Sequence, residues 1–373
     1  LLQQLHQLRD QKNVVAAVDN IAEANTLKVL DAMRECKVSE AHFNTTSGYA
    51  YDDIGRTKLE ELYARIFGAE RALVRTQFVS GTHALATVLF GILRPGDELV
   101  SLTGKPYDTM QTVIGYDNPS AGSLKEFGVL YNELPMIDGK VDMAGIQSVI
   151  TPQTKMVEIQ RSRGYSMRNP LSIEDIRAIT AEVHRLKPDC ICFVDNCYGE
   201  FTQIREPLSA GADVIAGSFI KNPGGGITPT GGYIAGKADL VEKISHRFTA
   251  PGIGKDLGCT QDSLRDTFLG FYYAPGVVCE ALKTAVYAQC LLELVGVNPV
   301  PRYTADHNDI VTCFDSGSAA ALQGFCAGIQ SCSPVDSFVS PEPADEPVNS
   351  SASSISTIYC IPQSFNIPFV IRK

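Results

Sequence analysis

The sequence predicts an α/β protein with a large domain built on a mainly parallel sheet flanked by helices, followed by a smaller C-terminal α+β domain. Two observations predict this class. From about residue 59, short apolar runs alternate with longer segments whose apolar residues recur at helical spacing. Such alternation is typical of strand–helix–strand units, which form parallel sheets. Polar residues also follow several of the apolar runs, where ligands bind in open α/β sheets.

The individual elements follow from the same patterns. One expected helix ends at Gly68, a residue type that terminates helices, and another opens with Ser172 and Asp175 in a capping-box pattern. The expected helices cover residues 14–38, 58–68, 81–93, 172–186 and 275–295. The expected strands cover residues 71–75, 97–102, 155–162, 190–196, 213–220 and 231–236.

These elements divide the chain into four parts. We expect an N-terminal helical arm and loop at 1–58, a large domain at 59–296, and a partial small domain at 297–340. The stretch 341–373 is rich in Ser, Pro and acidic residues near its start and shows no clear periodicity, so we expect an atypical, disordered tail.

Composition excludes some classes of partner. The chain of 373 residues carries a formal net charge of −10 without any cluster of Lys and Arg, so we expect no nucleic-acid partner. The longest apolar stretch, at residues 84–93, is interrupted by Thr and Gly and is about half the length of a membrane span. We therefore expect no association with a membrane.

The eleven cysteines are scattered through apolar segments, a pattern that favours reduced thiols over a disulfide framework. We expect a cytoplasmic location, or an organelle if a transit peptide precedes Leu1. Cys190 and Cys192 are separated by one residue, which is not a zinc-binding spacing, so we expect no metal site.

Lys221 lies between the apolar run 213–220 and three consecutive glycines. A P-loop is excluded, because its glycines precede the lysine and a helix follows it. Two readings remain from this stretch alone: a lysine that binds a cofactor covalently, or an ordinary turn lysine. Ser218 lies three residues earlier, so both side chains can reach one site from the same strand end.

Three further stretches follow expected strands. Ser80, Gly81 and Thr82 lie at the start of the helix at 81–93, where backbone N–H groups bind phosphate, although this stretch taken alone favours a simple helix cap. Asp195 ends a buried run and needs a positive partner, such as a protonated pyridine nitrogen, unless it is a turn residue. Tyr107 follows another strand and offers a ring for stacking.

A polar loop at residues 48–56 adds Tyr51 and Arg56. Each stretch is a weak signal alone. Together they provide a lysine, a carboxylate for a ring nitrogen, a phosphate-binding turn and a stacking ring, which are the groups that pyridoxal 5'-phosphate requires.

The chain resembles the fold-type-I pyridoxal-phosphate enzymes of cysteine and methionine metabolism. Within them it is most similar to the aluminium-resistance branch, related to cystathionine β-lyase and methionine γ-lyase. The resemblance covers roughly residues 14–339. It is carried by YDDIGRTKLEELYARIFGAERALVRTQFVSGTHA, EIQRSRGY, VDNCYGEF, GSFIKNPGGGI, APGIGK and CSPVDSFV. It implies a seven-stranded type of sheet and a homodimer or homotetramer with shared active sites.

The resemblance also implies roles. Lys221 would hold the cofactor and take the substrate Cα proton, and Asp195 would pair with the ring nitrogen. Tyr107 would stack on the ring. The phosphate would be bound by Ser80, Gly81, Thr82 and Ser218, and Tyr51 would reach the phosphate of a neighbouring subunit.

The chain departs from the wider family at several positions. Asp53 stands where an arginine is usual, which makes Arg56 the candidate substitute. The segment EIQRSRGY brings Arg161 and Arg163 towards the site, where one of them would bind the substrate carboxylate. The tail does not resemble the family.

The implied reaction is elimination of a β- or γ-sulfur group from a small amino-acid substrate. Another lyase or an aminotransferase on the same scaffold would use the same residues. The altered tail and Asp53 also leave open a protein that keeps the fold but has lost turnover. A nucleotide-binding protein using glycines 224–226 is disfavoured, because no G-x-G-x-x-G opens a helix there.

Overall fold

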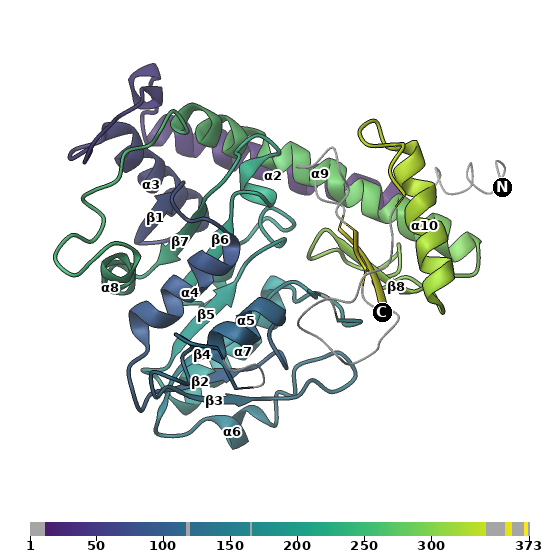
Figure 1. The fold of residues 1–373 in the computed structure, drawn as a ribbon, viewed down its shortest axis with the longest axis horizontal. Helices are drawn as coiled ribbons and strands as arrows, with labels where there is room; N and C mark the ends of the chain where they lie inside the picture. The colour runs from purple at the N-terminus through teal and green to yellow at the C-terminus, as the bar shows by residue number, and fades with distance from the viewer. Residues whose placement is uncertain (1–11, 117–119, 165, 341–354, 360–368, 372–373) are drawn as a thin grey trace.

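The computed structural model describes residues 12–116, 120–164, 166–340, 355–359 and 369–371 (Figure 1). The helices in these ranges are α2 (Lys12–Glu35), α3 (Ile54–Phe67), α4 (Gly81–Ile92), α5 (Asp108–Ile114), α6 (Ile146–Val149), α7 (Ile173–Leu186), α8 (Ala238–Phe248), α9 (Leu264–Leu294) and α10 (Ala319–Cys332). No helix among the described residues combines the length and apolar character needed to cross a bilayer.

The strands form two sheets. They are β1 (Arg71–Arg75), β2 (Glu98–Ser101), β3 (Leu130–Glu133), β4 (Thr154–Gln160), β5 (Ile191–Asp195), β6 (Val214–Ser218), β7 (Gly232–Gly236), β8 (Val311–Asp315), β9 (Ile355–Tyr359) and β10 (Phe369–Ile371). The large sheet has seven strands in the order β1-β7-β6-β5-β4-β2-β3, and only β7 runs against its neighbours. The predicted fold class, a mainly parallel sheet flanked by helices, is confirmed.

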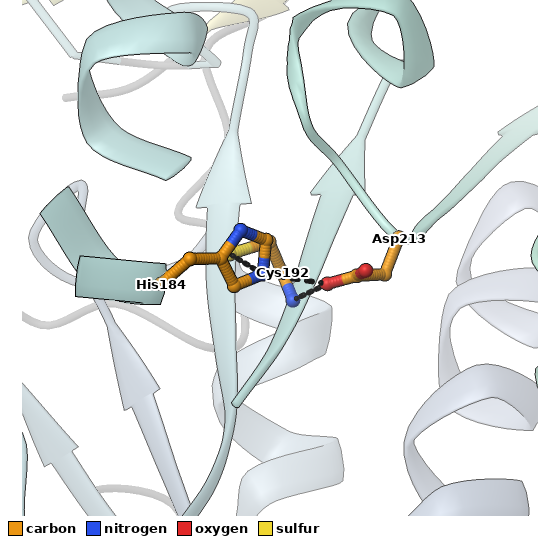
Figure 2. Close-up of side chains that lie close together, drawn as sticks. All are labelled: His184, Cys192 and Asp213. Atoms are coloured by element: carbon orange, nitrogen blue, oxygen red, sulfur yellow. Dashed lines mark hydrogen bonds and ion pairs between the residues drawn. The ribbon is translucent and has the colours of Figure 1, made fainter. Parts of the chain in front are cut away.

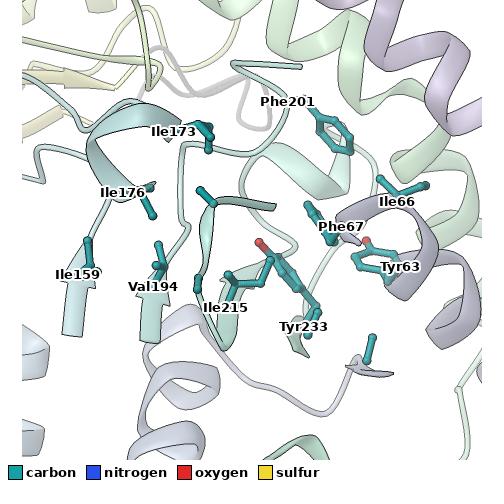
Figure 3. Close-up of a cluster of buried hydrophobic side chains, with 14 of the residues drawn as sticks. Tyr63, Ile66, Phe67, Ile159, Ile173, Ile176, Val194, Phe201, Ile215 and Tyr233 are labelled. Carbon is teal, nitrogen blue, oxygen red and sulfur yellow. The ribbon is translucent and has the colours of Figure 1, made fainter. Parts of the chain in front are cut away.

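Helices cover both faces of this sheet. On one face, the aromatic rings of Tyr63 and Phe271 stack with centroids 3.8 Å apart, and those of Phe67 and Tyr233 stack at 4.9 Å. Figure 3 shows this cluster, which joins α3 to the strands. On the other face, α4 and α8 pack through a second apolar cluster that includes Phe193. Both faces are therefore buried, as continuous apolar strands require.

The helix boundaries follow local chemistry. α3 starts at Ile54, earlier than expected, because the Asp53 side chain accepts a hydrogen bond of 2.7 Å from the Arg56 N–H and caps the helix. Gly68 ends it with a φ of 72°, as predicted. α9 begins at Leu264 and runs through Pro275, where we expected a helix to begin. A proline usually marks a helix boundary. Here α9 continues through Pro275, because it packs lengthwise against α2 (Figure 1).

A smaller unit follows α9. It contains α10 and the three-stranded sheet β10-β9-β8. Two parts of the stretch 341–373, for which we expected disorder, are thus strands: β9 pairs with β8, and β10 pairs with β9. The rest of that stretch lies outside the described residues. The segment ISTIY of β9 is rich in β-branched and aromatic residues, which favour strands, but it lies in Ser- and Pro-rich surroundings. The domain boundaries at 58, 296 and 340 stay a prediction.

Candidate active site

The carboxyl ends of β4, β5 and β6 meet at one edge of the large sheet. β4 ends at Gln160 and β5 at Asp195, and these two residues are register partners. β6 ends at Ser218, and Lys221 follows three residues later. Because parallel strands deliver their last residues to the same edge, the four side chains come from separate parts of the sequence to one place.

A cavity of about 80 Å³ lies at this edge. Lys221 and Asp195 both line it, as the sequence predicts for a cofactor site. The other residues that line it are Tyr107, Gln160, Ser162, Gly164, Cys197 and Tyr198. A second cavity of about 480 Å³ shares Tyr107 and Gln160 with the first. The two cavities together offer space for a planar ring and for a substrate beside it.

Lys221 is held above an aromatic ring. Its Nζ lies 4.1 Å from the centroid of the Tyr198 ring, and its backbone N–H donates to the carbonyl of Ser218 at 3.3 Å. Removal from water lowers the pKa of Lys221, but the negative charge available on Cys197, Tyr198, Asp195 and Tyr107 outweighs it, so the pKa is raised well above its ordinary value. Lys221 is therefore an ammonium group beside Asp195 until a carbonyl compound reacts with it.

Asp195 is a buried carboxyl group. Its Oδ1 accepts a hydrogen bond of 3.1 Å from the N–H of Cys197. Burial raises the pKa of Asp195, while the positive charge of Lys221 acts in the opposite direction. A protonated ring nitrogen would supply the charge that a buried carboxylate needs once Lys221 has reacted and lost its own.

The hydroxyl of Ser218 is an orphaned polar group. Ser218 is fully buried, and its Oγ has no hydrogen-bond partner among the described residues. It faces Gly81, the first residue of α4: a Cβ built on Gly81 would lie 3.1 Å from Ser218 Cβ and 3.7 Å from its Oγ. Phosphate oxygens would accept from this hydroxyl and from the N–H groups at the start of α4. The residues present fit the phosphate of the predicted cofactor.

Ser80 and Thr82 complete this turn. The Ser80 side chain caps α4 by accepting from the N–H of His83 at 3.1 Å, so the helix-cap reading of this residue holds. The Thr82 hydroxyl lies 3.0 Å from the phenol oxygen of Tyr107. Burial raises the pKa of Tyr107, which keeps it a neutral phenol. The Tyr107 N–H donates to Gln160 Oε1 at 3.2 Å and so ties α5 to the end of β4.

Two predicted cofactor ligands lie away from the cavity. Tyr51 is 66% exposed beside Tyr49, on the loop before α3. Arg56 is buried, and its guanidinium donates to the carbonyls of Ala50, Gly258 and Asp256 at 2.7–3.0 Å. Within this chain Arg56 therefore links the loop before α3 to the loop before α9 by hydrogen bonds, and it lines neither of the two cavities.

The two predicted substrate arginines have different surroundings. Arg161 is buried away from both cavities and donates to Asn196 at 2.8 Å and to Glu206 at 3.3 Å. Arg163 lines the larger cavity, with its Nε 3.6 Å from Asp309 and an Nη1 hydrogen bond to the Val300 carbonyl. The Nη2 of Arg163 has no hydrogen-bond partner among the described residues. The structure thus brings Arg163, and not Arg161, to the open space.

Sequence reasoning missed four residues at this site. Cys197 and Tyr198 directly follow Asp195 in the motif VDNCYGEF, and Gln160 stands in EIQRSRGY, so the motifs contained their signal. Arg168 lines the larger cavity, and burial lowers its pKa to about 10. Arg168 lies in the irregular segment after β4, where the sequence has no helix or strand pattern that would predict its place.

Comparisons with known proteins identify the family of this chain. A sequence model described as methionine gamma-lyase matches residues 3–356. The uncharacterized protein YnbB of Bacillus subtilis is 45% identical over 332 residues, which cover 88% of this chain and 79% of that protein. The solved structure of a carbon-sulfur lyase involved in aluminum resistance from Clostridium novyi is 44% identical, with a TM-score of 0.90, covering 96% of this chain and 88% of the other.

A more distant structure shows the fold alone. The pyridoxal-5'-phosphate-dependent protein YhfS of Escherichia coli is 17% identical, with a TM-score of 0.60 over 83% of this chain and 79% of its own. The expected cofactor, pyridoxal 5'-phosphate, is confirmed by the family match. The aluminium-resistance resemblance is likewise confirmed. Because the family match covers residues 3–356, the chain belongs to the methionine gamma-lyase family.

Proposed function

We propose that this protein is a pyridoxal-phosphate-dependent carbon–sulfur lyase that acts on a sulfur amino acid, by α,β- or α,γ-elimination. The observation that carries the proposal is the meeting of Lys221, Asp195 and the unpartnered Ser218 hydroxyl at one edge of the sheet. The family match and the similarity to a carbon-sulfur lyase support it. Cystathionine and methionine are the substrates that the family resemblance favours.

Each residue around the cavity has a separate role in such a reaction. When bound, pyridoxal phosphate supplies an electron-accepting ring conjugated to the substrate Cα. Lys221, released as a free amine, takes the Cα proton, and the Tyr198 ring beneath its Nζ restricts where the amine can go. Asp195 keeps the ring nitrogen protonated by its negative charge. Tyr107, a neutral phenol between both cavities, can stack on the ring.

The substrate carboxylate has a candidate partner in Arg163. Its unpartnered Nη2 belongs to a residue that lines the larger cavity, next to Tyr107 and Gln160. A guanidinium group binds a carboxylate with two parallel hydrogen bonds, but Asp309 already pairs with the Nε side of Arg163. We therefore propose a contact through Nη2 alone, and Arg161 is assigned to the support of Asn196.

Tyr51 has its proposed role outside its own chain. Its ring is exposed and far along the chain from the strand ends, so we propose that it reaches the phosphate site of a neighbouring subunit in a homodimer or homotetramer. A cytoplasmic location stays a prediction.

The visible absorbance spectrum of purified protein tests the cofactor and its lysine. We expect a yellow band in the wild type that is lost in Lys221→Ala. Keto-acid and thiol release from cystathionine, cysteine and methionine then test the reaction, with Lys221→Ala as the inactive control. A colourless wild type that takes up no added cofactor would refute the proposed cofactor site. A yellow protein without product from any of the three would refute the lyase reaction and favour a protein that has lost turnover.

A further inference from the structure

Three potential metal ligands gather at the opposite edge of the large sheet. His184 lies in the last turn of α7, Cys192 is the second residue of β5, and Asp213 directly precedes β6. Figure 2 shows the three side chains converging from these elements. They are separated in the sequence by 8 and 21 residues, so only the fold assembles them.

The spacing of the donor atoms suits tetrahedral coordination. His184 Nε2 lies 3.2 Å from Asp213 Oδ2 and 3.6 Å from Cys192 Sγ, and all three donors lie within 4.8 Å of one another. Around a tetrahedral Zn²⁺ with ordinary bond lengths, nitrogen and oxygen ligands are about 3.3 Å apart, and nitrogen and sulfur ligands about 3.6 Å apart. Two of the three separations therefore already match those of a bound ion.

The neighbours of Asp213 would orient and balance such a site. The N–H of Cys192 donates to Asp213 Oδ2 at 2.7 Å, and Lys237 Nζ lies 2.5 Å from Asp213 Oδ1. These contacts hold the carboxylate in one orientation, as outer-shell partners do in known metal sites. A divalent ion bound by one thiolate and one carboxylate forms a neutral unit, and Lys237 remains paired with the second oxygen. Binding would release the thiol proton of Cys192 to solvent.

Two of the three ligands are open to solvent. Asp213 lines a cavity of about 250 Å³ with Lys237 and with Asp189 and Cys190, which precede β5. The His184 side chain is 31% exposed, so its second ring nitrogen can donate to water. A fourth ligand, a water molecule, can therefore reach the ion from solvent.

We propose that His184, Cys192 and Asp213 form a binding site for one zinc-type divalent transition-metal ion, with water as the fourth ligand. From the sequence we expected no metal site, because Cys190 and Cys192 lack a zinc-binding spacing and no cluster of His and Cys lies near them along the chain. The nitrogen, thiolate and carboxylate set favours Zn²⁺ over Mg²⁺ or Ca²⁺, which prefer oxygen ligands.

The site would act on stability and not on the reacting atoms. Cys192 lies three residues before Asp195 along β5, and Asp213 lies five residues before Ser218 along β6, so the two site residues are roughly 10 and 16 Å from the ends held by the ion. An ion at this place ties the end of α7 to two central strands. It would stabilise the native state by mass action, because unfolded chain does not assemble the three ligands.

Zinc titration of the cofactor-loaded protein, stripped beforehand with a chelator, tests the site in competition with a chromophoric zinc indicator. The variants are His184→Gln and Cys192→Ser, with His246→Gln and Cys190→Ser as matched controls outside the ligand set. We expect one tight Zn²⁺ per wild-type chain, a more than tenfold loss of affinity in both ligand variants, and wild-type affinity in both controls. Zinc should raise the Tm of the wild type and of the controls only.

Two results would overturn the proposal. One is a wild type that binds no zinc tightly, which would leave the three residues as a hydrogen-bonded polar cluster. The other is unchanged affinity in His184→Gln, which would place any bound zinc elsewhere. Because the His184 side chain is partly exposed, this variant keeps the test decisive even if Cys192→Ser folds poorly.

Discussion

Gly81 and Ser218 lie so close that a methyl group on Gly81 would stand 3.1 Å from Ser218 Cβ and 3.7 Å from the unpartnered Ser218 Oγ. The contact joins the N-terminus of α4 to the end of β6. It places a hydroxyl group beside the N–H groups of a helix start, which is an arrangement suited to an anion. Two predictions test whether this contact binds the cofactor phosphate.

Ser218→Ala should weaken cofactor binding without weakening the fold. The hydroxyl has no partner within the described chain, so its removal leaves no protein group unsatisfied. We expect the Kd for pyridoxal phosphate to rise about tenfold, which corresponds to ~1.4 kcal/mol. The free energy of unfolding of the cofactor-free protein should be unchanged or slightly higher.

A matched control for this variant is Ser245→Ala. Ser245 is also fully buried, but its hydroxyl donates to the Glu242 carbonyl at 2.7 Å. It should lower stability by about 1 kcal/mol and leave cofactor affinity alone. Loss of stability without loss of affinity in Ser218→Ala would assign the hydroxyl a purely structural role.

Gly81→Ala should also weaken cofactor binding, for a steric reason. The new methyl group would occupy the approach to Ser218 Oγ, where we expect a phosphate oxygen. Titration of the variant with cofactor, followed by visible absorbance, should show a Kd raised by more than about tenfold. Wild-type affinity in this variant would mean that the phosphate lies elsewhere along the strand ends.

Gly276→Ala should stabilise the protein. Gly276 lies within α9, and a Cβ built on it meets no atom within 4 Å. Alanine restricts the unfolded chain and favours helix, so chemical denaturation should show a gain of about 0.5–1 kcal/mol. Because α9 passes Pro275 next to this position, a loss of stability would show that the helix needs glycine there to bend.

Glu158 should make stability depend on pH. Burial and, to a smaller extent, the negative charge of Asp195 raise the pKa of its carboxyl to about 8. Between its ordinary pKa of 4.5 and about 8, the folded protein holds a proton that the unfolded chain has lost. This contribution to stability is therefore complete below the ordinary pKa and is lost as pH rises through about 8, at up to about 1.4 kcal/mol per pH unit.

Glu158→Gln, which cannot ionise, checks this sign. The free energy of unfolding of the wild type should fall from pH 6 to pH 8 relative to that of the variant, as measured by urea denaturation. The exposed Glu23→Gln serves as the control and should follow the wild type. Parallel pH curves for the wild type and Glu158→Gln would show that Glu158 does not hold a proton in the folded protein.

Much of the fold and the centre of the site follow from local sequence. The alternation of apolar runs and helical segments determined most strands of the large sheet, since this periodicity is a property of neighbouring residues. Lys221, Asp195 and Ser218 could be grouped in advance, because parallel strands bring their carboxyl ends to one edge whatever their order. β3, β8, β9 and β10 were not among the expected strands, because each has five residues or fewer, too few for a periodicity to stand out.

The partners of the buried side chains were decided only by the tertiary structure. Arg56 and Arg161 have the chemistry of anion-binding residues, but the fold occupies their N–H groups with carbonyls of distant loops and with Asn196 and Glu206. The cluster of His184, Cys192 and Asp213 has no sequence signature at all. The physical reason is that backbone periodicity is local, whereas hydrogen-bond satisfaction in the interior depends on which distant segments pack together.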